Sequence, residues 1–145
     1  MNVNKIILAD DDEDDQIIFK EALAEIQDIQ LLFAKNGTEL MDIISNADIP
    51  PDLIFFNPHI CHIEEYNYIE TIKQNPQHSN IPLVIFTDST YDKHIDEVFN
   101  SGATLYIVKP VAFKKLKQLL TKVFELDIKT YLPQPARENF VLTHD

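Results

Sequence analysis

Residues 6–15 read IILADDDEDD, so four apolar residues run directly into six consecutive carboxylates. A short apolar run that does not alternate with polar residues is typical of a strand buried on both faces of a parallel sheet. Four more runs of this kind, rich in β-branched and aromatic residues, occupy residues 31–34, 53–56, 83–86 and 105–108. The sequence therefore predicts five strands.

Segments with the apolar spacing of amphipathic helices alternate with these strands. Their apolar positions are Ile18, Ala22 and Ile26; Leu40, Ile43 and Ile44; Tyr66, Ile69 and Ile72; Ile95, Val98 and Phe99; and Phe113, Leu116, Leu120, Val123 and Phe124. Strict alternation of strands and helices predicts an α/β fold in three layers, a doubly wound five-stranded parallel sheet with five helices.

The helical spacing stops after about Ile128, and two prolines interrupt residues 130–136. We predict one domain over residues 1–128 and a C-terminal tail over residues 129–145, extended or flexible, because chain ends usually fray. The alternative is a strap whose apolar side chains dock on the domain or on a partner. Its candidates are Tyr131, Leu132, Phe140 and Val141.

The composition of the 145 residues narrows the classes of function. The net charge of -12 repels nucleic-acid phosphates, and the Lys and Arg residues form no cluster large enough to overcome that repulsion. No apolar run approaches the roughly 20 residues that cross a bilayer. The single cysteine, Cys61, cannot form an internal disulfide. We therefore expect a cytoplasmic protein that binds neither nucleic acid nor membranes.

Polar side chains follow four of the five predicted strands. They are Asp10 and Asp11 after the first strand, Asn57 after the third, Thr87 and Asp88 after the fourth, and Lys109 after the fifth. In an open parallel sheet, ligands bind at the carboxyl ends of the strands, near the point where the strand order reverses. Carboxylates, an amide, a hydroxyl and an amine are therefore predicted to meet at one edge.

Four motifs in order resemble the receiver domain of response regulators in two-component signalling, and chemotaxis receivers in particular. They are ILADDD at residues 7–12, PDLIFFN at 51–57, IFT at 85–87 and GATLYIVKP at 102–110. The resemblance covers about residues 4–126, which leaves only the tail outside it. It implies a flavodoxin-like sheet with the strand order 2-1-3-4-5.

In that family, an acid pair after the first strand helps to hold Mg²⁺, and an aspartate after the third strand accepts a phosphoryl group from a histidine kinase. Asp10 and Asp11 match the acid pair, and Asn57 stands at the phosphoacceptor position. His59 matches the position whose backbone carbonyl completes the metal site. The resemblance therefore implies a metal site built from these residues.

Three further positions match the groups that respond to the phosphoryl group. The Thr87 hydroxyl and the Lys109 amine match the groups that engage its oxygens. Tyr106 matches the aromatic switch that reports the event to a partner. From the sequence alone, Tyr106 is equally compatible with a core residue and with a residue that faces a partner.

Asn57 changes the chemistry of this site. The amide oxygen is neutral and the amide nitrogen lone pair is delocalised, so neither atom is a useful nucleophile toward phosphorus. Losing one of three anionic ligands also predicts weakened Mg²⁺ binding. Asp88 stands where receivers usually carry a small residue. We expect it to face water near a helix start, with pairing to Lys109 or metal ligation as alternatives.

The other acids and the loop after Asn57 suggest further hypotheses. We expect Asp12 to Asp15 to cap the first helix and complement its dipole. His59, Cys61 and His62 suggest a transition-metal site, but their spacing is not a recognised one and closed zinc sites usually take four ligands. The preferred interpretation is a surface loop.

Together these features predict a stand-alone receiver domain, not an enzyme, that acts as a phosphorylation-independent protein-interaction module. The expected partner is a histidine kinase or a downstream signalling protein. The expected contact face comprises the fourth helix, the fifth strand and the fifth helix, and includes His94, Tyr106 and Lys117.

Two alternative functions use the same acids differently. In the first, an ordinary phosphorelay receiver uses Asp10, Asp11 or Asp88 as the acceptor. In the second, a phosphatase resembling the haloacid dehalogenases uses Asp10 as the nucleophile and Asp12 as the general acid. Asp14 stands where that phosphatase motif has Thr or Val, which counts against the second alternative.

Overall fold

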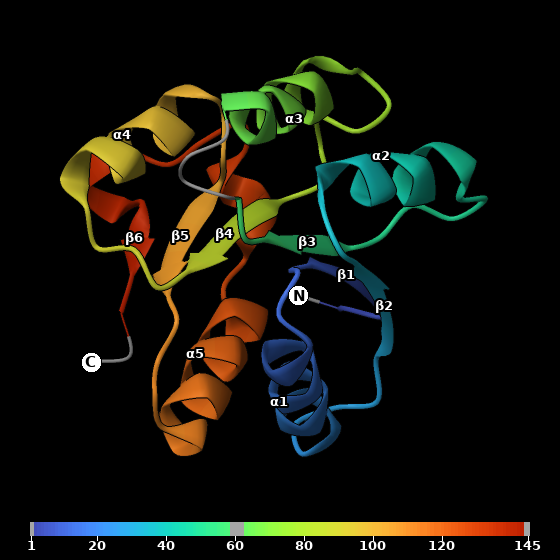
Figure 1. The fold of residues 1–145 in the computed structure, drawn as a ribbon, viewed down its shortest axis with the longest axis vertical. Coiled ribbons are helices and arrows are strands. Elements are labelled where there is room, and N and C mark those ends of the chain that lie inside the picture. The colour runs from blue at the N-terminus through green and yellow to red at the C-terminus, as the bar shows by residue number, and fades with distance from the viewer. Residues whose placement is uncertain (1, 59–62, 144–145) are drawn as a thin grey trace.

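A parallel sheet between two layers of helices forms the body of the protein (Figure 1). The structure is a computed structural model that describes residues 2–58 and 63–143. Its strands are β1 (Lys5–Ala9), β2 (Gln30–Ala34), β3 (Leu53–Phe56), β4 (Leu83–Thr87), β5 (Leu105–Val108) and β6 (Val141–Leu142). The order is β2-β1-β3-β4-β5-β6, with every neighbouring pair parallel. The predicted fold and the order of the five predicted strands are confirmed, and β6 is an addition.

Five α-helices connect and cover the strands. They are α1 (Glu13–Ala24), α2 (Gly37–Asn46), α3 (Ile63–Gln74), α4 (Asp92–Asn100) and α5 (Phe113–Glu125). Helices α1 and α5 lie on one face of the sheet, and α2, α3 and α4 lie on the other (Figure 1). In the described residues, no helix has the length and apolar character needed to span a membrane.

The strands are apolar throughout because both of their faces are buried. On β1, Ile6 and Leu8 belong to the core beneath α1 and α5, whereas Ile7 belongs to the core beneath the other three helices. On the first face, the ring of Phe19 packs edge-on against Phe55, with centroids 5.1 Å apart. These two cores hold the carboxyl ends of the strands in fixed positions.

The start of α1 follows directly from the acidic run. Asp12 is the N-cap, and its side chain accepts hydrogen bonds from the backbone N–H groups of Asp14 and Asp15 at 2.9 and 3.1 Å. An Asp at this position satisfies donors that the first turn leaves unpaired. The predicted capping role is therefore confirmed for Asp12.

The segment after α5, residues 127–143, is called the tail below. It contains two short 3-10 helices, η1 (Ile128–Tyr131) and η2 (Arg137–Asn139), and then β6. Ile128 and Phe140 are fully buried. The sequence did not predict a sixth strand, because two residues carry no detectable alternation and their pairing depends on where the tail runs.

Candidate functional site

Asp10 is the buried centre of the candidate site. It follows β1 directly and is 1% exposed. Its Oδ1 accepts a hydrogen bond of 3.0 Å from the backbone N–H of Asp12. Its backbone carbonyl accepts a bond of 2.6 Å from the Gln16 side chain on α1. A buried carboxylate needs compensation by hydrogen bonds and opposite charge, and the bond from the Asp12 N–H supplies part of it.

Lys109 supplies the opposite charge. Its backbone N–H donates to the Thr87 carbonyl at 2.8 Å, which fixes the residue at the carboxyl end of β5. Its Nζ lies 2.7 Å from Asp10 Oδ2 and 2.6 Å from Asp15 Oδ2. Burial by itself lowers the pKa of Lys109, but the bonds and charges of Asp10 and Asp15 outweigh it and raise that pKa above its usual value. The amine is therefore a firmly charged bridge between two carboxylates.

Asp15 is a site residue that the sequence analysis missed. The acidic run predicted only a capping and dipole role for it, whereas its carboxylate faces Lys109. The cap at Asp12 orients the first turn of α1, and this orientation brings Asp15 to the sheet edge. Six consecutive acids give no signal as to which of them points inward.

Asn57 lies at the carboxyl end of β3, beside Asp10. Its backbone N–H donates to the Ala9 carbonyl at 2.9 Å, and its Nδ2 lies 3.4 Å from Asp10 Oδ1. The second contact is long for a hydrogen bond and therefore weak. The amide thus presents a donor to Asp10 at the place where an aspartate would present another negative charge.

Thr87, the last residue of β4, and Asp88, which follows it, differ in their exposure to solvent. Thr87 is buried, whereas Asp88 is exposed and lies at the rim of a hollow of about 350 Å³. Lys109, Phe86 and apolar residues of the β5–α5 connection also line this hollow. The carboxylates bonded to Lys109 are those of Asp10 and Asp15, so Asp88 fits the expectation of an acid that faces water.

Tyr106 lies inside the protein. It is fully buried on β5, and its hydroxyl donates to the Ser89 carbonyl at 2.7 Å. Burial raises its pKa to about 12, with the Ser89 bond opposing that shift and the charge of Asp88 adding to it. The ring of His94 on α4 lies 6.1 Å away. The interpretation of Tyr106 as a residue that faces a partner is therefore wrong, and its core alternative is right.

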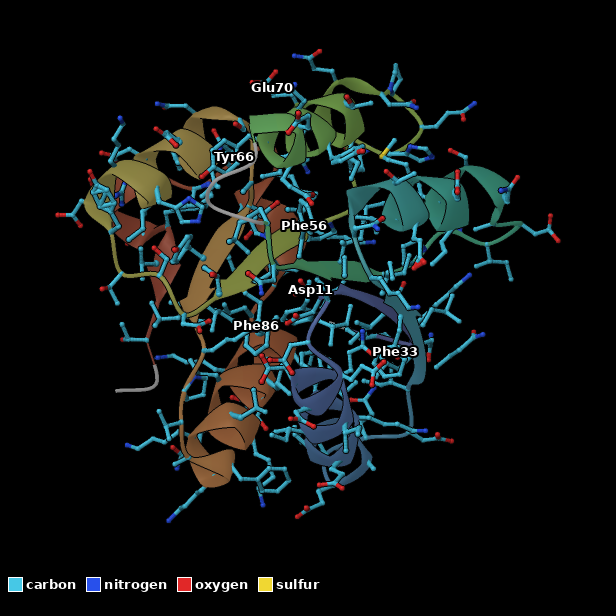
Figure 2. All side chains as sticks on the ribbon, viewed as in Figure 1. Asp11, Phe33, Phe56, Tyr66, Glu70 and Phe86 are labelled. Atoms are coloured by element: carbon cyan, nitrogen blue, oxygen red, sulfur yellow. The ribbon has the colours of Figure 1, made fainter. Side chains whose placement is uncertain are left out.

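His94 is buried as well. It is 1% exposed, its Nδ1 bonds the hydroxyl of Tyr66, and its Nε2 has no hydrogen-bond partner in the part of the chain that the structure describes. Figure 2 shows Tyr66 near the start of α3, on the side toward α4. His94 was expected on the partner face, and that expectation is wrong. Lys117 on α5 is half-buried, and its Nζ lies 3.1 Å from Oε1 of Glu25, the residue that follows α1.

The family model that matches this chain is the response regulator receiver domain, over residues 6–121. The chain belongs to this family. Among curated relatives, the sensor histidine kinase CheAY of Helicobacter pylori is 28% identical over 123 residues. That alignment covers 84% of this chain and 15% of CheAY, so the chain spans only a small part of that protein. The chemotaxis protein CheY-3 of Vibrio cholerae is 23% identical, with 83% of this chain and 92% of the relative covered.

Solved structures of response regulators share the fold. The phosphorylated cyanobacterial phytochrome response regulator RcpA is 24% identical, with a TM-score of 0.74 over 86% of this chain and 93% of RcpA. The Mn(2+)-bound form of response regulator Rcp1 is 20% identical, with a TM-score of 0.72 over 88% and 96% of the two chains. At these identities the likeness shows the fold alone.

Two of the residues predicted to hold Mg²⁺, Asp10 and Asn57, already have partners within this site. Among residues 2–58 and 63–143, no three His, Cys, Asp or Glu side chains gather closely enough to hold a metal ion. Asp10 Oδ2 is bonded to Lys109, and Asn57 contributes no charge. Figure 2 shows Asp11 where β1 gives way to α1. A metal would have to compete with the Lys109 ammonium for Asp10.

Three predicted site residues lie outside the described residues. His59, whose backbone carbonyl was expected to complete the Mg²⁺ site, is one of them. Cys61 and His62, the other members of the transition-metal hypothesis, are the remaining two. Both hypotheses stay predictions at these positions.

Proposed function

We propose that this receiver domain is a protein-interaction module of two-component signalling whose signal does not depend on an aspartyl phosphate. The contact that carries the proposal is the bridge from Lys109 to Asp10 and Asp15. In the receiver pattern, the lysine amine engages the phosphoryl oxygens. Here two carboxylates of the same chain bond that amine, so its charge already has partners without a phosphoryl group.

The residue at position 57 supports the same proposal. An amide does not act as the nucleophile in phosphoryl transfer, because its oxygen is neutral and its nitrogen lone pair is delocalised. The amide nitrogen of Asn57 lies 3.4 Å from Asp10 Oδ1. An aspartate at this position would place a second negative charge beside Asp10 and repel it, whereas Asn57 carries no charge. The site therefore has less need of a metal, and we propose that Mg²⁺ binding is weak.

The proposed activity is recognition of another protein rather than catalysis. The partner is a histidine kinase or a downstream signalling protein, in the cytoplasm, and it binds the side of the domain formed by α4, β5 and α5. Because His94 and Tyr106 are buried, direct contact comes from other residues of that side. The two aromatic residues support its shape from within.

Phosphorylation with a small acyl phosphate and Mg²⁺, followed by intact mass measurement, tests this function. We expect no added phosphoryl mass on the natural chain. The matched variant Asn57→Asp restores the acceptor and is expected to gain the mass. A stoichiometric gain on the natural chain would overturn the proposal and favour Asp10, Asp11 or Asp88 as acceptor.

A further inference from the structure

The tail lies on the side of the domain where the proposed partner would bind. Figure 1 shows β6 beside β5, next to α4 and at the end of the sheet opposite β2. Register pairs are Tyr106 with Val141 and Ile107 with Leu142. The backbone N–H of Tyr106 donates to the Phe140 carbonyl at 2.9 Å. The edge of β5 is therefore occupied by a short strand of the same chain.

One aromatic side chain anchors this strand. Phe140 is fully buried, and its ring centroid lies 5.0 Å from that of Phe99 on α4 and 6.0 Å from that of Tyr106 on β5. Val141 and Leu142, which pair with β5, are only half-buried. In β6 and the residues just before it, most of the apolar burial thus comes from the Phe140 ring, which lies in a recess between α4 and β5.

Polar contacts hold the residues that precede Phe140. The Gln134 side chain donates to the carbonyls of Phe99 and Ala103 at 2.6 and 2.8 Å, where α4 ends and the chain turns toward β5. Arg137 pairs with Asp96 on α4 at 2.9 Å, and both partners are exposed. The Arg137 guanidinium also lies 5.9 Å from the Phe140 ring centroid. In the tail, a cation and an aromatic ring three residues later therefore both contact α4.

We propose that the β5 edge is a binding site for an extended peptide segment of a partner protein, which replaces the tail. The segment adds a parallel strand to β5, inserts an aromatic ring between α4 and β5, and places a cation three residues earlier against Asp96. Strand addition supplies backbone hydrogen bonds, and the recess supplies specificity. This inference rests on the proposed function, since it identifies how the interaction module takes its ligand.

The tail is suited to replacement because its attachment is small. Among residues 2–58 and 63–143, two residue pairs join β6 to β5, and the ion pair to Asp96 is exposed. Units with few buried apolar contacts open at a lower free energy than the core. A ligand in solution must still overcome the high effective concentration of a tethered tail, which lies in the millimolar range for short linkers.

The test uses a labelled peptide of residues 134–143, QPARENFVLT, and full-length variants. Phe140→Ala removes the anchor from the tail. Phe33→Ala, on the opposite edge strand β2, removes a ring of the same size as a matched control. We expect the peptide to bind the Phe140→Ala protein about 100-fold more tightly than the natural or Phe33→Ala protein, because only the first has lost its tethered competitor.

Amide hydrogen exchange reports the state of the tail in the same proteins. The Tyr106 amide bonds the tail, whereas the Thr104 amide bonds the Leu83 carbonyl on β4. In Phe140→Ala we expect Tyr106 to exchange at least about tenfold faster and Thr104 to remain protected. Added peptide should restore the protection of Tyr106, and a peptide carrying Phe140→Ala should not.

Three outcomes would overturn the inference. One is equal peptide affinity for all three proteins, and another is unchanged protection of Tyr106 in Phe140→Ala. The third is a stable dimer of the natural chain that exchanges its tails, because the ligand of the edge would then be a second copy. Phosphorylation of the natural chain would contradict the proposed function while leaving the peptide result intact, so the two failures are distinguishable.

Discussion

The pocket at the carboxyl ends of the strands and the edge of β5 are stabilised by different forces. In the pocket, Lys109 bridges two carboxylates at 2.6 and 2.7 Å, and Asp10 is buried. At the β5 edge, the buried ring of Phe140 packs on other aromatic rings, and the ion pair beside it is exposed. Removing a partner should therefore cost most where a buried charge is left unpaired.

The largest effect is expected from Lys109→Met. This change leaves the buried Asp10 carboxylate without its cation, and breaking such a pair costs about 3–5 kcal/mol of unfolding free energy. Urea unfolding measures the loss. Lys117→Met, which removes the half-buried partner of the exposed Glu25, is the matched control and should cost less than about 1 kcal/mol.

The double variant Asp10→Asn with Lys109→Met tests the reason for that loss. It should recover most of the stability, since no buried charge then remains unpaired. Equal losses in the Lys109 and Lys117 variants would show that the pocket depends no more on charge than the surface does.

Asn57→Asp should have the next largest effect. Two carboxylates about 4 Å apart repel by about 4 kcal/mol at an effective dielectric constant near 20. Because Lys109 and solvent offset part of this, we expect a net loss of about 1–2 kcal/mol in urea unfolding without metal. Millimolar Mg²⁺ should restore stability in the variant and change the natural chain little. Equal stabilisation of both proteins by Mg²⁺ would contradict weak metal binding in the natural chain.

His94 should make the folding stability of the protein depend on pH. Burial lowers its pKa from the usual 6.5, with the charge of Glu97 opposing the shift, and the other groups that face it are the hydroxyl of Tyr66 and the ring of Tyr106. Because the folded chain binds this proton less tightly than the unfolded chain, stability is complete above about pH 6.5 and falls as the pH drops below it.

The slope from this one group is at most about 1.4 kcal/mol per pH unit. Urea unfolding of the natural chain and of His94→Phe between pH 7.5 and 5 measures it, because the other titrating groups are common to both proteins. The variant should lose the His94 contribution to the slope. Identical slopes would show that protonation of His94 does not affect folding.

Arg137→Ala should have the smallest effect. Its ion pair with Asp96 is exposed on both sides, and such pairs contribute less than about 1 kcal/mol. Exchange of the Tyr106 amide should quicken only slightly, in contrast to its response to Phe140→Ala. A response as large as that of the Phe140 variant would mean that charge, rather than burial, holds the β5 edge.

Much of the fold could be predicted from local pattern. Residues 53–56 and 105–108 were predicted as strands and coincide with β3 and β5. Their continuous apolar character reflects burial on both faces, which is a property of each segment by itself. Strand β6 could not be predicted in this way, because Val141 and Leu142 form a strand only by pairing with β5.

The candidate site was predictable in part for the same reason. Asp10 and Lys109 were identified because strand ends meet at one edge of a parallel sheet. Asp15 was missed, His94 was expected to face a partner, and Tyr106 was left open between the core and a partner face. In each of these cases the sequence indicated an element correctly but carried no signal for the direction of a single side chain.

The sequence by itself determined the alternation of strands and helices and the chemistry at position 57, since an amide is a poor nucleophile in any fold. Tertiary structure decided what the remaining groups do. Lys109 meets carboxylates 99 and 94 residues earlier in the chain, and Phe140 meets β5 from beyond α5. Local patterns record burial and backbone preference, whereas pairing across such separations depends on strand order and on the path of the tail.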